Sequence, residues 1–303
     1  MPLRSVNPAT GELMGEYPEL SSHELQEKLV LAEQAFLSWR TTPLSDRAEL
    51  MRRMAQYLRS QKTRLGRLAS LEMGKTLVAA ETEVEKCALT CEYYATHAAG
   101  FLTPEALGLP IKESFATFEP LGIVLAVMPW NFPFWQVYRF AAPALMAGNV
   151  GLLKHASNVP QCAEAMEAAF TEVGFPVGVF QNLAITSTHV ESAIRDPRVK
   201  AVTLTGSEHA GSMVAKVAGE ELKKTVLELG GSDPFLVLAD ADVALAVKTA
   251  ATVRLQANAG QSCIAAKRFI VHRDVVDVFT SQLVERFQAL KIGDPLDSGT
   301  EVG

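Results

Sequence analysis

The pattern that most constrains the fold is the alternation, after Pro120, of short apolar runs with helix-length segments. Four apolar runs occupy residues 122–128, 150–153, 179–183 and 199–205, with helical sequence such as 161–173 between them. Strands that alternate with helices form βαβ units around a parallel sheet that is buried on both faces. Further strands are expected at 235–238 and 268–272, and further helices from 242 to about 256 and from 275 to 290. The sequence therefore predicts an α/β fold.

The first third of the chain has the pattern of amphipathic helices. Between residues 21 and 40 apolar side chains recur at helical spacing, and Ser21 with Glu24 forms a capping box at the start. A second helical segment begins near Ser45, and the pattern continues to about His97. We expect these helices to cover the sheet. Residues 109–120 are expected to form an extended arm or a hairpin.

Composition limits the possible classes of function. The chain has 303 residues, of which 48% are hydrophobic and 20% charged, enough apolar material for two cores. The net charge is −6 and basic residues are scattered among acidic ones, which argues against nucleic acid as a partner. Because no apolar stretch reaches the roughly 20 residues of a membrane span and no signal peptide is evident, we expect a soluble cytoplasmic protein without a membrane partner. Cysteine and histidine spacings predict no metal site.

Polar residues follow three predicted strands, at the carboxyl edge where open parallel sheets bind their ligands. Asn131 lies within Met128-Pro129-Trp130-Asn131-Phe132-Pro133, where two prolines stiffen the backbone around an amide suited to stabilising an oxyanion. Lys154 ends the next run, and its flexible ammonium could reach phosphate or ribose oxygens. Gly206-Ser207 forms a strand-to-helix turn whose amides could hold an anion. A proline-rich turn or a solvated lysine would explain these residues equally well.

Two further residues could supply proton transfer and a nucleophile. Glu228 ends an apolar stretch before Gly230-Gly231, and burial there would raise its pKa into the range of a general base. Cys263 lies in a tight connection between a predicted helix and a predicted strand, the partly exposed kind of place that reactive cysteines occupy. Taken singly, such a glutamate is usually solvated and such a thiol usually inert. The other three cysteines lie in helical sequence and are expected to be packing residues: Cys87, Cys91 and Cys162.

Six motifs in order resemble the signature of the aldehyde dehydrogenase superfamily. They are Pro129-Trp130-Asn131-Phe132-Pro133, Ala147-Gly148-Asn149, Leu153-Lys154, Thr205-Gly206-Ser207, Glu228-Leu229-Gly230-Gly231 and Gly260-Gln261-Ser262-Cys263. The resemblance begins at Asn7-Pro8-Ala9-Thr10-Gly11 and covers essentially the whole chain. It implies a parallel Rossmann-type cofactor domain followed by an incomplete α/β catalytic domain. With the hinge at Gly230-Gly231, these domains are residues 1–229, including the arm near 109–120, and residues 230–303.

The resemblance implies that the motifs serve the oxidation of an aldehyde by NADP or NAD. Cys263 would be the nucleophile and Glu228 the general base, and the Asn131 amide with the Cys263 backbone N–H would form the oxyanion hole. Six positions match residues that line the family's cofactor site: Trp130, Lys154, Ser157, Gly206, Ser207 and Leu229. Ser157 stands where members that bind NAD alone often have a glutamate that would repel a 2′-phosphate, so NADP is compatible with this site.

Further matches bear on the substrate. Arg139 matches an arginine that succinate-semialdehyde dehydrogenases use against the substrate carboxylate, a pairing that suits a guanidinium fork. An ordinary ion pair is the alternative for Arg139. The segment from Gln261 to Arg268 looks most like the bacterial succinate-semialdehyde dehydrogenases, so succinate semialdehyde is the favoured substrate. Ala257 and Ser232 depart from the family pattern, which has an arginine in some members at the first position and usually a lysine at the second.

The chain is shorter than members of the family, which continue through the rest of the catalytic domain and a last strand used in oligomerisation. We therefore expect an exposed apolar face here, and a homo-oligomer for the full-length protein. The alternative function is a truncated, non-catalytic dinucleotide-binding fragment. A cysteine hydrolase acting through Cys263 is a third possibility, but it would not explain Lys154 or Gly206-Ser207.

Overall fold

The computed structural model describes residues 2–108 and 114–303. The chain begins with an antiparallel hairpin of β1 (Leu3–Val6) and β2 (Leu13–Tyr17), followed by the helices α1 (Ser22–Trp39), α2 (Leu44–Ser60), α3 (Lys62–Met73) and α4 (Leu77–Phe101). The capping box predicted for α1 is confirmed. Ser21 Oγ accepts from the Glu24 N–H at 3.2 Å, and the Glu24 carboxylate accepts from the Ser21 N–H at 2.7 Å.

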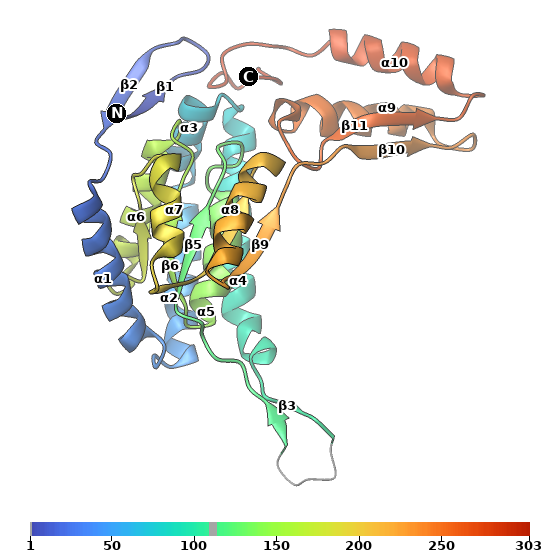
Figure 1. The fold of residues 1–303 in the computed structure, drawn as a ribbon. Helices are drawn as coiled ribbons and strands as arrows, with labels where there is room; N and C mark the ends of the chain where they lie inside the picture. Colours follow the sequence, from blue (N-terminus) through green and yellow to red (C-terminus); the bar gives the residue numbers. More distant parts are fainter. Residues whose placement is uncertain (1, 109–113) are drawn as a thin grey trace.

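A narrow arm extends away from the body of the molecule after α4 (Figure 1). Its described part contains β3 (Glu105–Ala106) and β4 (Phe115–Ala116), which pair antiparallel. Residues 109–113 of the arm expected from the sequence lie outside the described residues. Phe115 and Phe118 are exposed on it.

A parallel five-stranded sheet forms the centre of the fold, which confirms the predicted βαβ pattern. Its strands are β5 (Ile123–Val127), β6 (Val150–Lys154), β7 (Phe180–Asn182), β8 (Val199–Thr205) and β9 (Lys224–Glu228). Their order is β7-β6-β5-β8-β9. Because the chain moves outward from β5 to β7 and then returns to β8, the direction of winding reverses between β5 and β8. Ligands of open α/β sheets bind at the carboxyl edge beside such a reversal.

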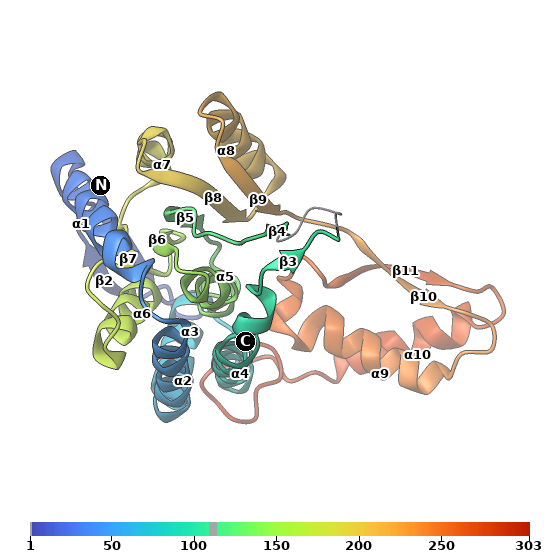
Figure 2. The same cartoon turned by 90° about the horizontal axis from the view of Figure 1, so that it is seen from below.

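The helices form layers around this sheet (Figure 2). The connecting elements are α5 (Trp135–Met146), α6 (Pro160–Val173), the short 3-10 turn Ser187–His189, α7 (Val190–Arg195) and α8 (Glu208–Glu220). Helices α5 and α6 lie on one face, and α7 and α8 lie on the other. Of the N-terminal helices that we expected to cover the sheet, α1 packs along β5, β6 and β7. Helices α2, α3 and α4 instead form a further layer, mainly against α5 and α6.

A smaller unit follows β9 and projects to one side of the sheet (Figure 1). It consists of β10 (Asp233–Val237), α9 (Val243–Ala251), a π-helical turn (Thr252–Gln256), a 3-10 turn (Asn258–Gly260), β11 (Ala266–Val271) and α10 (Val276–Gln288). Strands β10 and β11 pair in parallel, and Val237, Val247 and Phe279 belong to a separate core. The helix expected from 242 to about 256 is present, and its last turn, Thr252–Gln256, is π-helical instead of α-helical.

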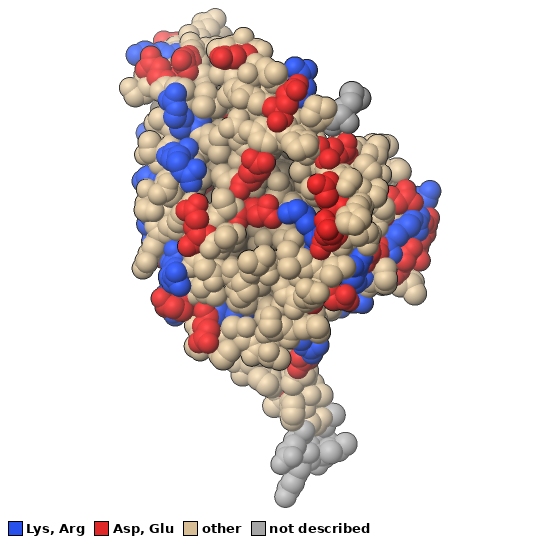
Figure 3. Space-filling view, turned by 90° about the vertical axis from the view of Figure 1, so that its left-hand side faces the viewer, with Lys and Arg blue, Asp and Glu red and all other residues tan. Residues whose placement is uncertain are grey.

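The surface of this smaller unit is partly apolar. Leu236 and Leu238 are both 64% exposed and Ile270 is 51% exposed, which confirms the expected exposed apolar face. On the face of the molecule shown in Figure 3, acidic and basic side chains are interspersed. Within residues 2–108 and 114–303, no helix combines the length and apolar composition that a membrane span requires.

Gly178 tests how closely α1 packs on the sheet. It has φ +91°, and a Cβ there would lie 2.7 Å from the Leu31 carbonyl oxygen and 2.9 Å from the Ala35 Cβ. We predict that Gly178→Ala lowers the free energy of unfolding by roughly 2–5 kcal/mol, because left-handed strain and overpacking add. Gly100→Ala is the control, since nothing lies within 4 Å of its added methyl. Urea denaturation of both variants measures the difference, and equal stability of the two would contradict this packing.

Candidate active site

A cavity of about 420 Å³ lies at the carboxyl edge of the central sheet, where the smaller unit meets it. We call it the edge cavity. Seven of the residues singled out from the sequence line it: Trp130, Asn131, Gly206, Ser207, Glu228, Leu229 and Cys263. They follow the carboxyl ends of β5, β8 and β9, and Cys263 comes from the loop before β11. Four segments of the sequence therefore meet at the reversal of the sheet.

Cys263 differs from the other cysteines in its surroundings. It is partly exposed, whereas Cys87, Cys91 and Cys162 are fully buried. Desolvation raises the pKa of each of these three buried thiols, which keeps them protonated and unreactive. Both expectations from the sequence, packing roles for the three and partial exposure for Cys263, are confirmed.

The loop that carries Cys263 has an unusual backbone. Asn258, Ala259 and Gly260 have φ values of +63°, +52° and +71°, so three consecutive residues adopt the left-handed conformation. A Cβ at Gly260 would lie 2.3 Å from the carbonyl oxygen of Arg254, so only glycine fits there. Such a backbone persists only where the surroundings hold it in place.

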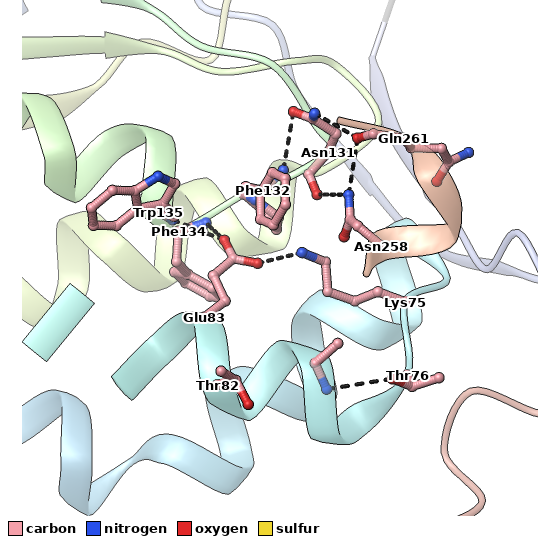
Figure 4. Close-up of polar contacts among 12 residues, drawn as sticks. Lys75, Thr76, Thr82, Glu83, Asn131, Phe132, Phe134, Trp135, Asn258 and Gln261 are labelled. Carbon is pink, nitrogen blue, oxygen red and sulfur yellow. Dashed lines mark hydrogen bonds and ion pairs between the residues drawn. The ribbon is translucent and has the colours of Figure 1, made fainter. Parts of the chain in front are cut away.

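Asn131 is tied directly to this loop (Figure 4). Its Nδ2 donates to the Gln261 carbonyl at 2.8 Å, and its Oδ1 accepts from the Phe132 N–H at 3.1 Å. In return, Asn258 Nδ2 donates to the Asn131 carbonyl at 2.9 Å. The Asn131 amide carries a second N–H in addition to the one that Gln261 accepts, so this side chain is held in place and still has a donor for a ligand.

A buried ion pair that the sequence reasoning missed supports the same turn. Lys75 Nζ lies 2.5 Å from Glu83 Oε2, and both side chains are at most 2% exposed. The other oxygen, Oε1, accepts from the N–H groups of Phe134 and Trp135, each at 2.8 Å (Figure 4). The Lys75 ammonium also lies 4.1 Å from the centre of the Phe132 ring. One signal was available, because Glu83 falls among the apolar positions of α4 that face the core.

His155 holds the turn from a third direction. This buried ring donates from Nε2 to the Pro133 carbonyl at 2.9 Å, while Nδ1 accepts from the Ala156 N–H at 2.8 Å. Nδ1 also lies 3.3 Å from the Met128 carbonyl, a longer contact than the one with the Ala156 N–H. Desolvation by burial is the main reason that the pKa of His155 is lowered to about 4.

Glu228 and Arg139 form a pair beside the cavity. Arg139 Nη1 lies 3.8 Å from Glu228 Oε2, and its Nη2 donates to Thr205 Oγ1 at 3.2 Å. Glu228 is not buried, because its side chain is 53% exposed on the edge strand β9, as the alternative of a solvated glutamate expects. Arg139 lines a neighbouring groove of about 470 Å³, and Glu228 lines both this groove and the edge cavity. The carboxylate can therefore be reached from either side.

The remaining predicted residues surround the start of α8 and the end of β6. Ser207 is the N-cap of α8, and its hydroxyl accepts from the Ala210 N–H at 3.2 Å. Leu229 packs closely against Gly211: a Cβ added at Gly211 would lie 2.5 Å from Leu229 Cδ2. Lys154, at the end of β6, has its pKa lowered by desolvation, and its ammonium makes no hydrogen bond or ion pair within the described part of the chain. Ser157 is exposed. A partly buried ammonium without a protein partner could hold an anionic or hydroxyl-bearing ligand.

The buried His155 makes a prediction about pH. Its folded-state pKa of about 4 lies below the unfolded value of 6.5, so the unfolded chain takes up the proton first as the pH falls. The stabilisation is complete above pH 6.5 and is lost as the pH falls toward 4. Between about pH 7.5 and about pH 5 the parent should lose roughly 2 kcal/mol more stability than His155→Gln, whose amide does not titrate. Denaturation at both pH values measures this, and equal losses would show that His155 is not buried in its neutral form.

Comparison with known proteins gives the family. A model of the aldehyde dehydrogenase family matches residues 1–303. A Synechocystis protein named a probable succinate-semialdehyde dehydrogenase (NADP(+)) is 51% identical, with all of this chain and 66% of that protein aligned. A Mycobacterium avium succinate-semialdehyde dehydrogenase (NADP(+)) is 52% identical, with 100% of this chain and 65% of that protein covered.

A solved structure agrees with these sequence matches. The succinic semialdehyde dehydrogenase from Streptococcus pyogenes, in complex with NADP+, superimposes with a TM-score of 0.96 at 37% identity. The match covers 98% of this chain and 66% of that one, so the chain spans about two thirds of the length of its relatives. The α/β fold with its parallel sheet is thus the fold expected from the motifs. The family match over all 303 residues places this chain in the aldehyde dehydrogenase family.

Proposed function

We propose that the protein oxidises an aldehyde to a carboxylic acid, with Cys263 as the nucleophile and NADP as the hydride acceptor. The observation that carries this proposal is the edge cavity, which brings Cys263, Asn131 and Glu228 together beside Gly206 and Ser207. A thiol, an amide donor and a carboxylate are the groups that acyl chemistry through a cysteine requires. Because the chain spans about two thirds of its relatives, the activity is proposed for the whole protein.

In the first step the Cys263 sulfur attacks the aldehyde carbon. An ordinary thiol is only a few per cent thiolate near neutral pH, so a base must take its proton. Glu228 lines the same cavity and would accept this proton directly or through one water. The oxygen of the resulting thiohemiacetal develops negative charge, and the free N–H of the Asn131 amide with the Cys263 backbone N–H would stabilise it.

In the second half of the reaction the thiohemiacetal is oxidised to a thioester, which water then hydrolyses. Bound NADP would supply a hydride acceptor, and loss of hydride from the thiohemiacetal carbon would leave a thioester on Cys263. Glu228, which would first release the thiol proton to solvent, would then take a proton from a water molecule that attacks this thioester. The carboxylic acid leaves, and the Cys263 sulfur recovers a proton. The exposure of Glu228 suits this role, since water must reach its carboxylate.

The residues around α8 fit a dinucleotide. Lys154 has no protein partner in the described chain, so its ammonium is available for phosphate or ribose oxygens. The exposed Ser157 presents no carboxylate that would repel a 2′-phosphate, which agrees with the NADP(+) in the names of both relatives. Trp130, Gly206, Ser207 and Leu229 would line the rest of the site.

For the substrate we propose succinate semialdehyde, the aldehyde named in both relatives. Arg139 supports this choice, because its guanidinium could pair with the distal carboxylate. A substrate carboxylate at Arg139 would replace Glu228, whose distance of 3.8 Å makes it a loosely held partner. We also propose a cytoplasmic location, where reducing conditions keep Cys263 as a thiol, and a homo-oligomer for the full-length protein.

The nucleophile assignment makes a direct prediction. Cys263→Ala should lower the rate of aldehyde-dependent NADPH formation by at least roughly 10³-fold, because the acyl group then has no attachment point. NADP affinity, measured by calorimetry, should stay unchanged. Cys91→Ala is the control, since Cys91 is a buried packing residue of α4 and should retain activity.

Three outcomes distinguish the candidate functions. NADPH formation that persists in Cys263→Ala would rule out this cysteine as the nucleophile. A parent chain that binds NADP but oxidises no aldehyde would support the alternative of a non-catalytic dinucleotide-binding fragment. Release of acid from an ester without NADP would support the cysteine hydrolase.

A further inference from the structure

Asn258 is a buried polar residue with no assigned part in the reaction proposed above. It is 3% exposed and lies five residues before Cys263, in the 3-10 turn Asn258–Gly260. Its φ of +63° is in the left-handed region, which asparagine tolerates better than most residues with a side chain. Asn258 does not line the edge cavity, so any effect on the reaction must act through other residues.

The contacts of Asn258 join two distant segments (Figure 4). Its Nδ2 donates to the Asn131 carbonyl at 2.9 Å and to the Gln261 carbonyl at 3.0 Å. The Gln261 carbonyl also accepts from Asn131 Nδ2 at 2.8 Å. The three residues thus form a closed set of hydrogen bonds across 127 positions of sequence, between the turn after β5 and the loop of Cys263. Neither segment can shift without breaking one of these bonds.

Asn258 carries an energetic cost that packing alone does not explain. Its Oδ1 is buried and has no hydrogen-bond partner within residues 2–108 and 114–303. An unsatisfied buried acceptor is destabilising, and a left-handed residue with a side chain adds to this cost. Asn258 therefore does not serve stability alone. Strained polar residues of this kind cluster at active sites, where the position of a group is part of the mechanism.

We propose that Asn258 is a positioning residue that fixes the distance between the Asn131 amide and Cys263. The proposal rests on the function proposed above for these two residues. An oxyanion donor lowers the barrier only if it is held in place before the reaction, because reorganisation would otherwise consume the gain. The two N–H groups of Asn258 supply this constraint, one to the backbone of the donor residue and one to the backbone beside the nucleophile.

Two glycine substitutions at neighbouring left-handed positions separate positioning from loop stability. Asn258→Gly keeps the backbone conformation accessible and removes both donors. Ala259→Gly also introduces a glycine at a positive φ, of +52°, but removes no hydrogen bond. Both variants should fold, since glycine favours this backbone. A role limited to holding the loop together would affect stability and leave the kinetics of the folded protein unchanged.

The first measurement is steady-state oxidation of succinate semialdehyde with NADP. Asn258→Gly should lower kcat by roughly 10- to 100-fold, as displacement of a catalytic group does, with little change in KM. Ala259→Gly should keep kcat within roughly 2-fold of the parent. If the parent turns over and Asn258→Gly retains its kcat, the positioning role is wrong while the proposed function stands.

The second measurement does not depend on turnover. Because the other three cysteines are buried, a thiol reagent such as iodoacetamide reports on Cys263 in the folded protein. The alkylation rate of Cys263 should change several-fold in Asn258→Gly and stay at the parent value in Ala259→Gly. Equal rates in all three proteins would overturn the positioning role, even for a parent chain that oxidises no aldehyde.

Discussion

The buried ion pair of Lys75 and Glu83 is the interaction on which the rest of the site depends. Desolvation of two charges is costly, and their attraction offsets it only when further hydrogen bonds satisfy them. Here Glu83 accepts two backbone N–H groups at the start of α5, and Lys75 lies over the Phe132 ring. The N-terminal helices, which hold none of the proposed catalytic residues, therefore determine where the turn after β5 lies.

The turn that carries Asn131 is held from three directions. Glu83 binds its C-terminal end, His155 binds the Pro133 carbonyl and Asn258 binds the Asn131 carbonyl. These three residues come from three different parts of the chain. These three contacts hold the Asn131 amide rigidly next to the loop of Cys263. A hydrogen-bond donor that is fixed before the reaction is what electrostatic stabilisation of an oxyanion requires.

The elements that could be predicted from the sequence are those with local signals. The run at 199–205 coincides with β8, because a strand that is mostly buried, with Lys200 exposed, is a mainly apolar segment bounded by turn residues. Strand β9 was not predicted from the sequence, because it is an edge strand on which Val226 is 60% exposed. Its position at the edge of the sheet also leaves the Glu228 side chain exposed. Lys75 and Asn258 act through contacts between distant segments, which local patterns do not reveal.

The central claim is that Cys263 carries the acyl group between oxidation and hydrolysis. The most direct test uses Glu228→Gln, which should form the thioester slowly, through the few per cent of Cys263 that is already thiolate, and should hydrolyse it more slowly still. The variant is mixed with succinate semialdehyde and NADP and quenched in acid, and its peptides are mapped by mass spectrometry. We expect the succinyl group on the peptide that contains Cys263, in an amount equal to the NADPH formed. NADPH formed with the acyl group on another residue, or with no acyl group on the protein, would contradict this account.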